Sequence, residues 1–314
     1  MRRRLLAGVA AVLIASGAGA WRAIVPAAES PTMPIAGVAP TYGPAAVTAV
    51  PNAAAVTRRI WQPGLDAGYN AQGLTVAGGA LYVATYRSDS SSVHRGPCRV
   101  FRLDPASGRE TGHFDIPSPC GHAGGMAAGG DGKLYIADTH TLFATPLAHA
   151  FDPGGPAFRS FPLGPGVVGA LAVSTADGIW LGAYHPDRPG EFFRFTAATL
   201  AALKDGEKLT AALAATAMTI PDHAQGAAIS PSGQLWVARS NTRWGTLDRL
   251  DLATGAPRAR YDTAAGIEGI AFDDSGTLWA VSEAGVRHYY DQPFAGLVVP
   301  FYPLVFALDL TRLR

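Results

Sequence analysis

Short apolar runs separated by glycine-containing turns recur along most of this chain. In five segments a small residue precedes an apolar run, a turn with glycine follows, and a second apolar run carries an aromatic residue. These segments recur roughly every 50 residues, which is typical of repeated units of four strands. The glycines that align at the start of the five segments are Gly73, Gly125, Gly169, Gly226 and Gly269.

Each segment is predicted to form two antiparallel strands joined by a tight turn, because glycine supplies the positive φ that short hairpins need. A second hairpin is predicted around Ser107-Gly108 and around Thr254-Gly255. Four strands per repeat predict an all-β protein, a β-propeller, with five blades counted and six possible. The predicted turns of the first hairpins are Gly78-Gly79, Asp131-Gly132, Asp177-Gly178, Ser232-Gly233 and Ser275-Gly276.

The predicted repeats also suggest how the ring closes. Residues 304–310 form a third strand of the last repeat, and we expect residues 57–61 to add its fourth strand. Such closure removes the free sheet edges that would otherwise pair with other chains. In the third repeat the spacing of leucines over residues 197–215 predicts a short helical excursion. Aromatic residues that recur at one position of the repeat are expected to pack between blades; they are Tyr82, Tyr135, Trp180, Trp236 and Trp279.

The first residues have the features of a secretory signal peptide. Arginines at 2–4, an apolar run over 5–15 and small residues at 18–20 predict cleavage after residue 20. The apolar run is shorter than the roughly 20 residues that span a membrane, and an uncleaved anchor is the alternative. The expected domains are therefore a signal peptide (1–20), an Ala/Pro-rich tether (21–56) and a β-propeller (57–314).

A signal peptide implies a secreted protein or one of the cell envelope, with no membrane span after cleavage. In that oxidising environment Cys98 and Cys120 are expected to form a disulfide. The alternative is a thiol pair for metal or redox chemistry.

The composition of the chain restricts the kinds of molecule that it is expected to bind. Of 314 residues 16% are charged and the net charge is +1, which argues against a nucleic-acid binder because such proteins carry a basic excess. The sequence also lacks a P-loop, an H-E-x-x-H helix and a G-x-S-x-G elbow. A small-molecule ligand and a monomeric protein are therefore expected.

The phrase D/S-G-x-L-W/Y-V-A, as in residues 232–238, resembles the NHL and the regucalcin/gluconolactonase/strictosidine-synthase-like propellers. The resemblance covers about residue 71 to the last residue, and members of that group usually have six blades. It implies hydrolysis of a lactone or ester, or a lyase-type elimination. Members that bind calcium do so with acidic and amide side chains at the channel mouth, and only Asn70, Gln72, Gln225 and Glu268 are of that type at the aligned positions. A calcium site is therefore not carried over by the resemblance.

Propeller geometry brings residues before each aligned glycine, and residues after each second strand, to one face around the central channel. His122, His223 and Glu268 come from three blades at nearly equivalent places. Histidine and a partly desolvated glutamate suit acid–base catalysis. Two histidines and a glutamate also suit a divalent metal such as Zn or Ca, although the cofactor is left open. The alternative is that these side chains only hydrogen-bond neighbouring blades.

Further polar residues on the same face are candidates for substrate binding. An arginine there offers a bidentate fork for a carboxylate, although a solvated rim is the alternative. The sequence thus indicates a secreted propeller enzyme, a lactone/ester hydrolase or lyase, and the alternative is a non-catalytic ligand- or protein-binding propeller at the cell envelope. The candidates are Asn70, Gln72, Tyr86, Arg87, Asp138, His140, Tyr184, Gln225, Arg239 and Glu283.

Overall fold

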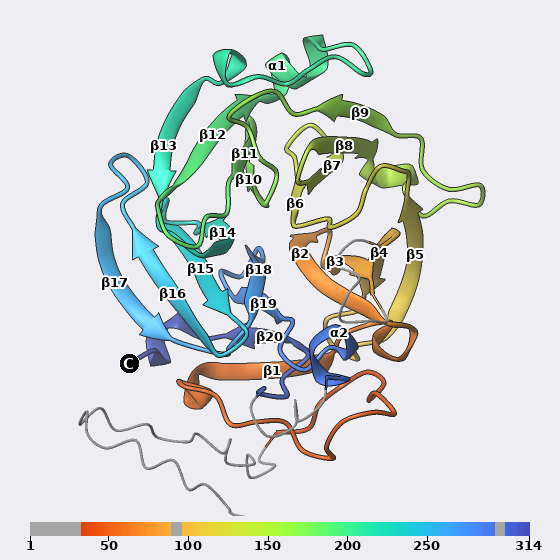
Figure 1. Ribbon diagram of the computed structural model, residues 1–314, viewed down its shortest axis with the longest axis vertical. Coiled ribbons are helices and arrows are strands. Elements are labelled where there is room, and N and C mark those ends of the chain that lie inside the picture. The colour runs from red at the N-terminus through yellow and green to blue at the C-terminus, as the bar shows by residue number, and fades with distance from the viewer. Residues whose placement is uncertain (1–32, 89–95, 293–298) are drawn as a thin grey trace, which may run out of the picture.

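The computed structural model describes residues 33–88, 96–292 and 299–314 (Figure 1). The expected signal peptide and residues 21–32 of the expected tether lie outside these ranges. Within them the chain forms five four-stranded antiparallel sheets arranged as blades around one axis, which confirms the five-bladed β-propeller. No helix in these ranges has the length and apolar character needed to cross a membrane.

The blades follow one another along the chain. The first contains β2 (Tyr69–Ala77), β3 (Ala80–Arg87), β4 (Cys98–Leu103) and β5 (Glu110–Ile116). The second contains β6 (Gly125–Ala128), β7 (Lys133–Asp138), β8 (Thr141–Pro146) and β9 (Arg159–Pro162). The third contains β10 (Leu171–Thr175), β11 (Gly178–Gly182), β12 (Gly190–Thr196) and β13 (Thr216–Ile220). The fourth contains β14 (Ala224–Ile229), β15 (Leu235–Asn241), β16 (Trp244–Leu250) and β17 (Pro257–Asp262).

The fifth blade joins the two ends of the domain. It contains β18 (Ile267–Phe272), β19 (Leu278–Ser282), β20 (Leu304–Leu308) and β1 (Val56–Trp61). Strand β1 pairs antiparallel with β20, with Ile60 opposite Val305, so the predicted closure of the ring by an early strand is confirmed.

Helices occupy only connections. The predicted excursion of the third blade contains α1 (Ala197–Ala202), whose first turn is capped by the Thr196 hydroxyl accepting from the Thr199 N–H. A second helix, α2 (Arg287–Tyr290), lies in the connection between β19 and β20. The single-turn 3-10 helices are η1 (Ala53–Ala55), η2 (Leu65–Ala67), η3 (Leu147–His149), η4 (Ala211–Leu213) and η5 (Leu310–Arg312).

Four of the aligned glycines sit where the inner strands meet around the axis, whereas Gly169 precedes β10 and in the third blade Leu171 and Ala172 take that place. A Cβ atom on Gly125 would lie 2.2 Å from the Ala172 nitrogen, and one on Gly226 would lie 2.3 Å from the Glu268 carbonyl oxygen. With five blades the inner strands approach backbone to backbone, so only glycine fits. At this level the axis has no room for a water molecule. A ligand site is thereby restricted to the ends of the channel.

Packing between blades uses the recurring aromatic position, as predicted. Tyr82, Tyr135, Trp180, Trp236 and Trp279 are all buried. Residues 33–55, part of the expected tether, run against the fifth blade: Ala36 forms a parallel bridge with Ile60, Val47 is buried, and the Thr48 N–H donates to the Phe301 carbonyl.

Candidate active site

Three inner strands bulge at the same end of the channel. The register shifts between Ala71 and Leu74 in β2, between Ala224 and Gly226 in β14, and between Ile267 and Ile270 in β18. A bulge inserts an extra residue and re-aims its side chain. The residues inserted are Gln72, Gln225 and Glu268, so two amides and one carboxyl gather at what we call the channel mouth.

Two buried carboxyl groups meet at the channel mouth. Glu268 is 1% exposed and Glu283, which directly follows β19, is 6% exposed. Burial raises the pKa of Glu283 to about 7, and burial together with the charge of Glu283 raises the pKa of Glu268 well above its usual range. Two interacting carboxyls titrate as a unit, so the pair retains a proton near neutral pH.

Hydrogen-bond donors surround this carboxyl pair. The Gln72 Nε2 atom donates to the Glu283 Oε2 atom at 2.8 Å, and the Tyr289 hydroxyl also stabilises the Glu283 carboxylate. The charge of Glu283 and burial raise the pKa of Tyr289; burial and the two glutamate charges raise the pKa of Tyr86. Both tyrosines therefore keep their protons; the Tyr289 hydroxyl donates to Glu283, and the Tyr86 hydroxyl can donate to a ligand.

Several polar atoms at the mouth lack a hydrogen bond of good geometry. Within the described part of the chain these are the buried Glu268 Oε1, the Ser240 Oγ and both amide atoms of Asn70, although Ser240 interacts with Glu268 and Asn70 with Tyr86. Asn70 lies opposite Tyr86 in the strand register, and the Ser240 hydroxyl is close enough to Glu268 to offset part of the rise in its pKa. Buried polar groups are normally paired, so this cluster is prepared for a water molecule or a ligand.

His122 reaches the same region through Tyr86. The two rings stack with centroids 5.1 Å apart and an interplanar angle of 22°. Asp138 holds the loop that carries His122, because its Oδ1 atom accepts the backbone N–H groups of Gly121, His122 and Ala123 at 3.2, 2.7 and 3.0 Å. Asp138 thus fixes a loop rather than facing the carboxyl pair.

The predicted disulfide between Cys98 and Cys120 is present, with Cα atoms 5.9 Å apart. It links β4 of the first blade to the loop before β6 of the second. Together with Asp138 it fixes the position of His122 from two sides.

His223 lies farther out on the rim. Its Nδ1 atom is 3.1 Å from the Asp222 Oδ2 atom, and its ring centroid is 6.0 Å from that of Tyr184. Arg239 is held by carboxylates of its own blade: it forms an ion pair with Asp222 and another with Asp248 at 3.1 Å. The Arg239 guanidinium is therefore committed to the fourth blade.

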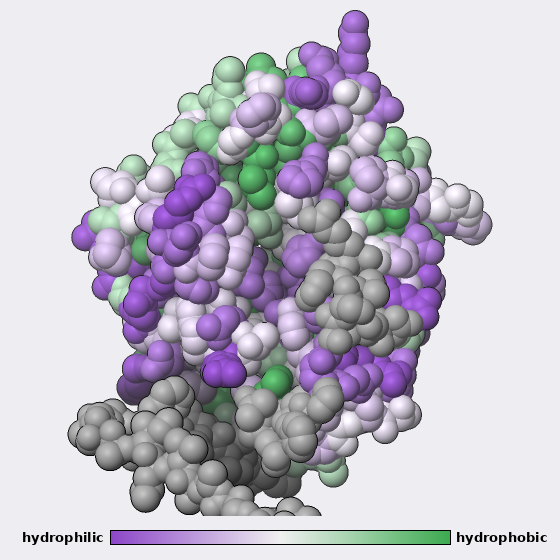
Figure 2. Space-filling view, in the orientation of Figure 1, coloured by the Kyte–Doolittle hydropathy of each residue, from purple (hydrophilic) through white to green (hydrophobic). Residues whose placement is uncertain are grey.

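The remaining predicted residues form the outer rim. Gln225 and Tyr184 are half-buried, whereas Arg87 and His140 are exposed. Burial raises the pKa of Tyr184, and the charges of Glu268 and Glu283 add to this rise, which places Tyr184 near the carboxyl pair. Figure 2 shows hydrophilic residues near the middle of this face and over β16 and β17.

The proposed metal ligands are not gathered. Among the described residues, the one group of three candidate ligands within 4.8 Å of each other is Cys98, Cys120 and Asp138. Its cysteines are joined in the disulfide, so they do not offer the thiolates that zinc requires. His122, His223 and Glu268 do not form such a group, and the structure instead pairs Glu268 with Glu283.

Sequence reasoning missed Tyr289 and Ser240. Tyr289 belongs to α2, in the connection between β19 and β20, and Figure 1 shows α2 between the fifth and first blades. The feature of the sequence that could have indicated Tyr289 was the length of the connection between β19 and β20. This connection starts at the channel mouth, where β19 ends, so residues inserted in it can reach the mouth.

Comparisons with known proteins support the fold. No protein-family model matches the sequence, and no curated protein matches it. A solved glutaminyl cyclase from Myxococcus xanthus is similar at 14% identity and a TM-score of 0.52, with 81% of this chain and 94% of that chain covered. A calcium-binding regucalcin from Agrobacterium tumefaciens is similar at 18% identity and a TM-score of 0.38, with 77% and 93% covered. The cyclase comparison therefore shows a shared fold at low sequence identity.

Proposed function

We propose that this protein is a propeller enzyme that uses the Glu268–Glu283 pair for acid–base catalysis on a small molecule at the channel mouth. The observation that carries the proposal is the pair itself: two buried carboxyls with raised pKa values, next to polar atoms of Ser240 and Asn70 that lack hydrogen bonds of good geometry. Pairs of carboxyls with perturbed pKa values are typical of catalytic centres.

The chemistry that fits best is cleavage of a lactone or ester, or a lyase-type elimination. In hydrolysis the ionised carboxyl of the pair takes a proton from water, and the resulting hydroxide attacks the carbonyl carbon. The protonated carboxyl gives its proton to the departing oxygen when the C–O bond breaks. Tyr86, which stays protonated, donates a hydrogen bond to the developing oxyanion, while the Tyr289 hydroxyl stays bound to Glu283. His122 positions Tyr86 by stacking on it, and His223 borders the rim beside Tyr184.

We also propose export to the cell envelope, since the signal sequence and the disulfide agree with an oxidising environment. Calcium is an alternative to the shared proton and not part of the catalytic proposal: the oxygens of Asn70, Gln72, Glu268 and Glu283 are of the ligand type that Ca²⁺ prefers, but binding it would require both carboxyls to be ionised.

The test is turnover of a substrate panel by Glu268→Gln and Glu283→Gln. The panel contains lactones, esters and, because the similar solved propeller is a glutaminyl cyclase, a peptide with N-terminal glutamine. Each substitution keeps shape but removes the titrating group, so the turnover rate is expected to fall by about 10²- to 10⁴-fold. Glu191→Gln is the matched control, because Glu191 pairs with His185 and Arg188 on the third blade.

Normal turnover by either folded variant would exclude the pair as the acid–base device. The alternative function, a non-catalytic binding propeller, is favoured by the closed axis below the mouth. It predicts that panel compounds raise the melting temperature, that the two variants abolish this shift, and that no product forms.

A further inference from the structure

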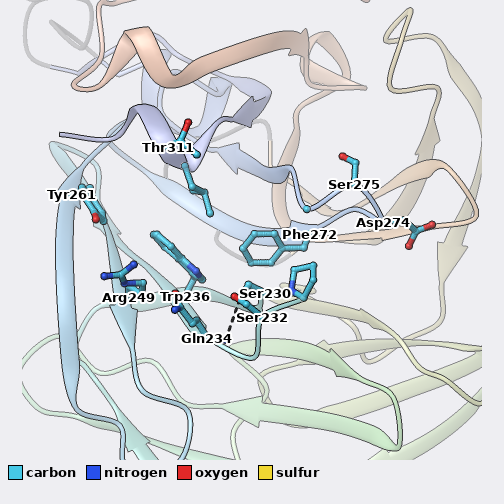
Figure 3. Close-up of a pocket in the computed structure, with 13 residues that line it drawn as sticks. Ser230, Ser232, Gln234, Trp236, Arg249, Tyr261, Phe272, Asp274, Ser275 and Thr311 are labelled. Atoms are coloured by element: carbon cyan, nitrogen blue, oxygen red, sulfur yellow. Dashed lines mark hydrogen bonds between the residues drawn. The ribbon is translucent and has the colours of Figure 1, made fainter.

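A separate groove lies on the side of the propeller away from the channel mouth. It is bounded by the hairpin turns of the fourth and fifth blades, at residues 230–234 and 274–276, and by η5. Its volume is about 570 Å³, within the range of small-molecule sites. Figure 3 shows the side chains that line it.

The groove has an aromatic and apolar floor. Trp236 stacks on Tyr261, with ring centroids 6.1 Å apart and an interplanar angle of 21°. Phe272 comes from the fifth blade and Leu310 from η5, and Figure 3 shows Phe272 beside Trp236. Flat apolar surfaces of this kind bind the faces of ring compounds.

Arg249 places an unneutralised positive charge at one end. It lies opposite Trp236 in the register of β15 and β16. Its Nε atom is buried and makes no hydrogen bond, and within the described ranges its guanidinium has no carboxylate partner. Two other arginines of the fourth blade, Arg239 and Arg260, by contrast, both pair with Asp248. A partly buried donor without an acceptor is costly, and a ligand that supplies the acceptor removes this cost.

Comparison between blades identifies a second free donor. In the fifth blade the Trp279 indole N–H donates to the Asp273 Oδ2 atom at 2.9 Å. In the fourth blade Ser230 stands at the place of Asp273, so among the described residues the Trp236 indole N–H does not make the bond to a carboxylate that Trp279 makes. The fourth blade therefore lacks the carboxylate that its neighbour supplies internally.

We propose that this groove binds an organic monocarboxylate with a ring-sized body, either an aromatic acid or a sugar acid. The carboxylate accepts from Arg249, while the ring lies against Phe272 and the exposed edge of the largely buried Trp236. Figure 3 shows Asp274 at the opposite end from Arg249, so a second anionic group on the ligand is disfavoured there. Hydroxyls of Ser230, Ser232 and Ser275 line the groove, but Ser230 and Ser232 bond each other and Ser275 donates to Asp273.

The test is titration calorimetry with benzoate and with glucuronate, which separate the two sources of carboxylate. Benzamide and glucose are the uncharged counterparts. At least one acid is expected to bind, and its uncharged counterpart is expected to bind at least tenfold more weakly. Arg249→Gln is expected to lower the affinity for that acid by about tenfold or more. Arg58→Gln is the matched control, because Arg58 lies in the equivalent groove between the fifth and first blades and already donates to two carbonyls.

A second variant keeps the proposal testable if Arg249→Gln fails to fold. Ser230→Asp restores an acidic group beside Trp236 and repels an incoming carboxylate, so binding is expected to be lost while the melting temperature does not fall. Failure of both acids to bind the native protein, or binding unchanged in both variants, would overturn the proposal. Because the groove is remote from the glutamate pair, either result is distinguishable from failure of the proposed catalysis.

Discussion

At the scale of single residues, the main feature is a pair of carboxyls that the fold prevents from ionising together. The sequence placed both Glu268 and Glu283 on the mouth but grouped Glu268 with His122 and His223. Aligned positions in a repeat identify which face a residue occupies. They do not give the direction of its side chain, which here is decided by the bulge at Glu268 and by contacts of Gln72 and Tyr289 with Glu283.

This pair makes stability depend on pH in a defined direction. Between the ordinary pKa of glutamate near 4.5 and the raised pKa of Glu283 near 7, the folded protein binds more protons than the unfolded chain. The free energy of unfolding therefore falls as pH rises through this window, by about 3 kcal/mol for Glu283 alone. Glu283→Gln is expected to reduce the fall by about this amount, because the buried Glu268 still contributes its own part; the measurement is urea unfolding at pH 5 and pH 7.5.

Glu191→Gln serves as the control for that experiment. Arg188 and His185 lower the pKa of Glu191 to about 2, so this carboxyl stays ionised throughout the window and its removal should leave the slope unchanged. An equal slope in the native protein and in Glu283→Gln would show that Glu283 titrates normally.

At the scale of elements, the loop before β6 depends on one carboxylate. The sequence predicted the disulfide at Cys120 correctly, but it treated Asp138 as a candidate for substrate binding. The structure uses Asp138 to accept three consecutive backbone N–H groups, a role that depends on a loop conformation and has no signature in residue spacing. Buried N–H groups that lose their acceptor are costly.

Asp138→Ala is therefore expected to lower the free energy of unfolding by about 2 to 4 kcal/mol, because three N–H groups lose one shared acceptor. Asp138→Asn keeps an acceptor oxygen and should lose less. The measurement is urea unfolding, with the exposed Asp152→Ala as control. A loss in Asp138→Ala no larger than in Asp152→Ala would contradict the structural role.

At the scale of the whole molecule, the ring was predictable because its signals are local and repeated. Hairpin turns, the five aligned glycines and the early closing strand all follow from strand period and turn chemistry. The contacts that complete the channel mouth could not be predicted from the repeats, because Tyr289 lies in α2, within the connection between β19 and β20 of the fifth blade. The same applies to residues 33–55, whose low charge and lack of period gave no sign that they contact the fifth blade.

Closure of a five-bladed ring also makes a prediction about the aligned glycines. A Cβ atom on Gly226 would lie 2.3 Å from the Glu268 carbonyl oxygen, so Gly226→Ala must push the fourth and fifth blades apart. In Gly233→Ala, in the turn of the same hairpin, the added Cβ meets no atom within 4 Å. This substitution loses only the free energy needed to hold alanine at a positive φ of 78°, about 1 kcal/mol.

Gly226→Ala should lower the free energy of unfolding by more than 2 kcal/mol in urea titrations. It should also shift the Glu283 titration by displacing Glu268, whereas Gly233→Ala should leave that titration in place. Equal losses of stability in the two variants would mean that the blades can separate freely at the axis, and the tight ring would then not be what positions the carboxyl pair.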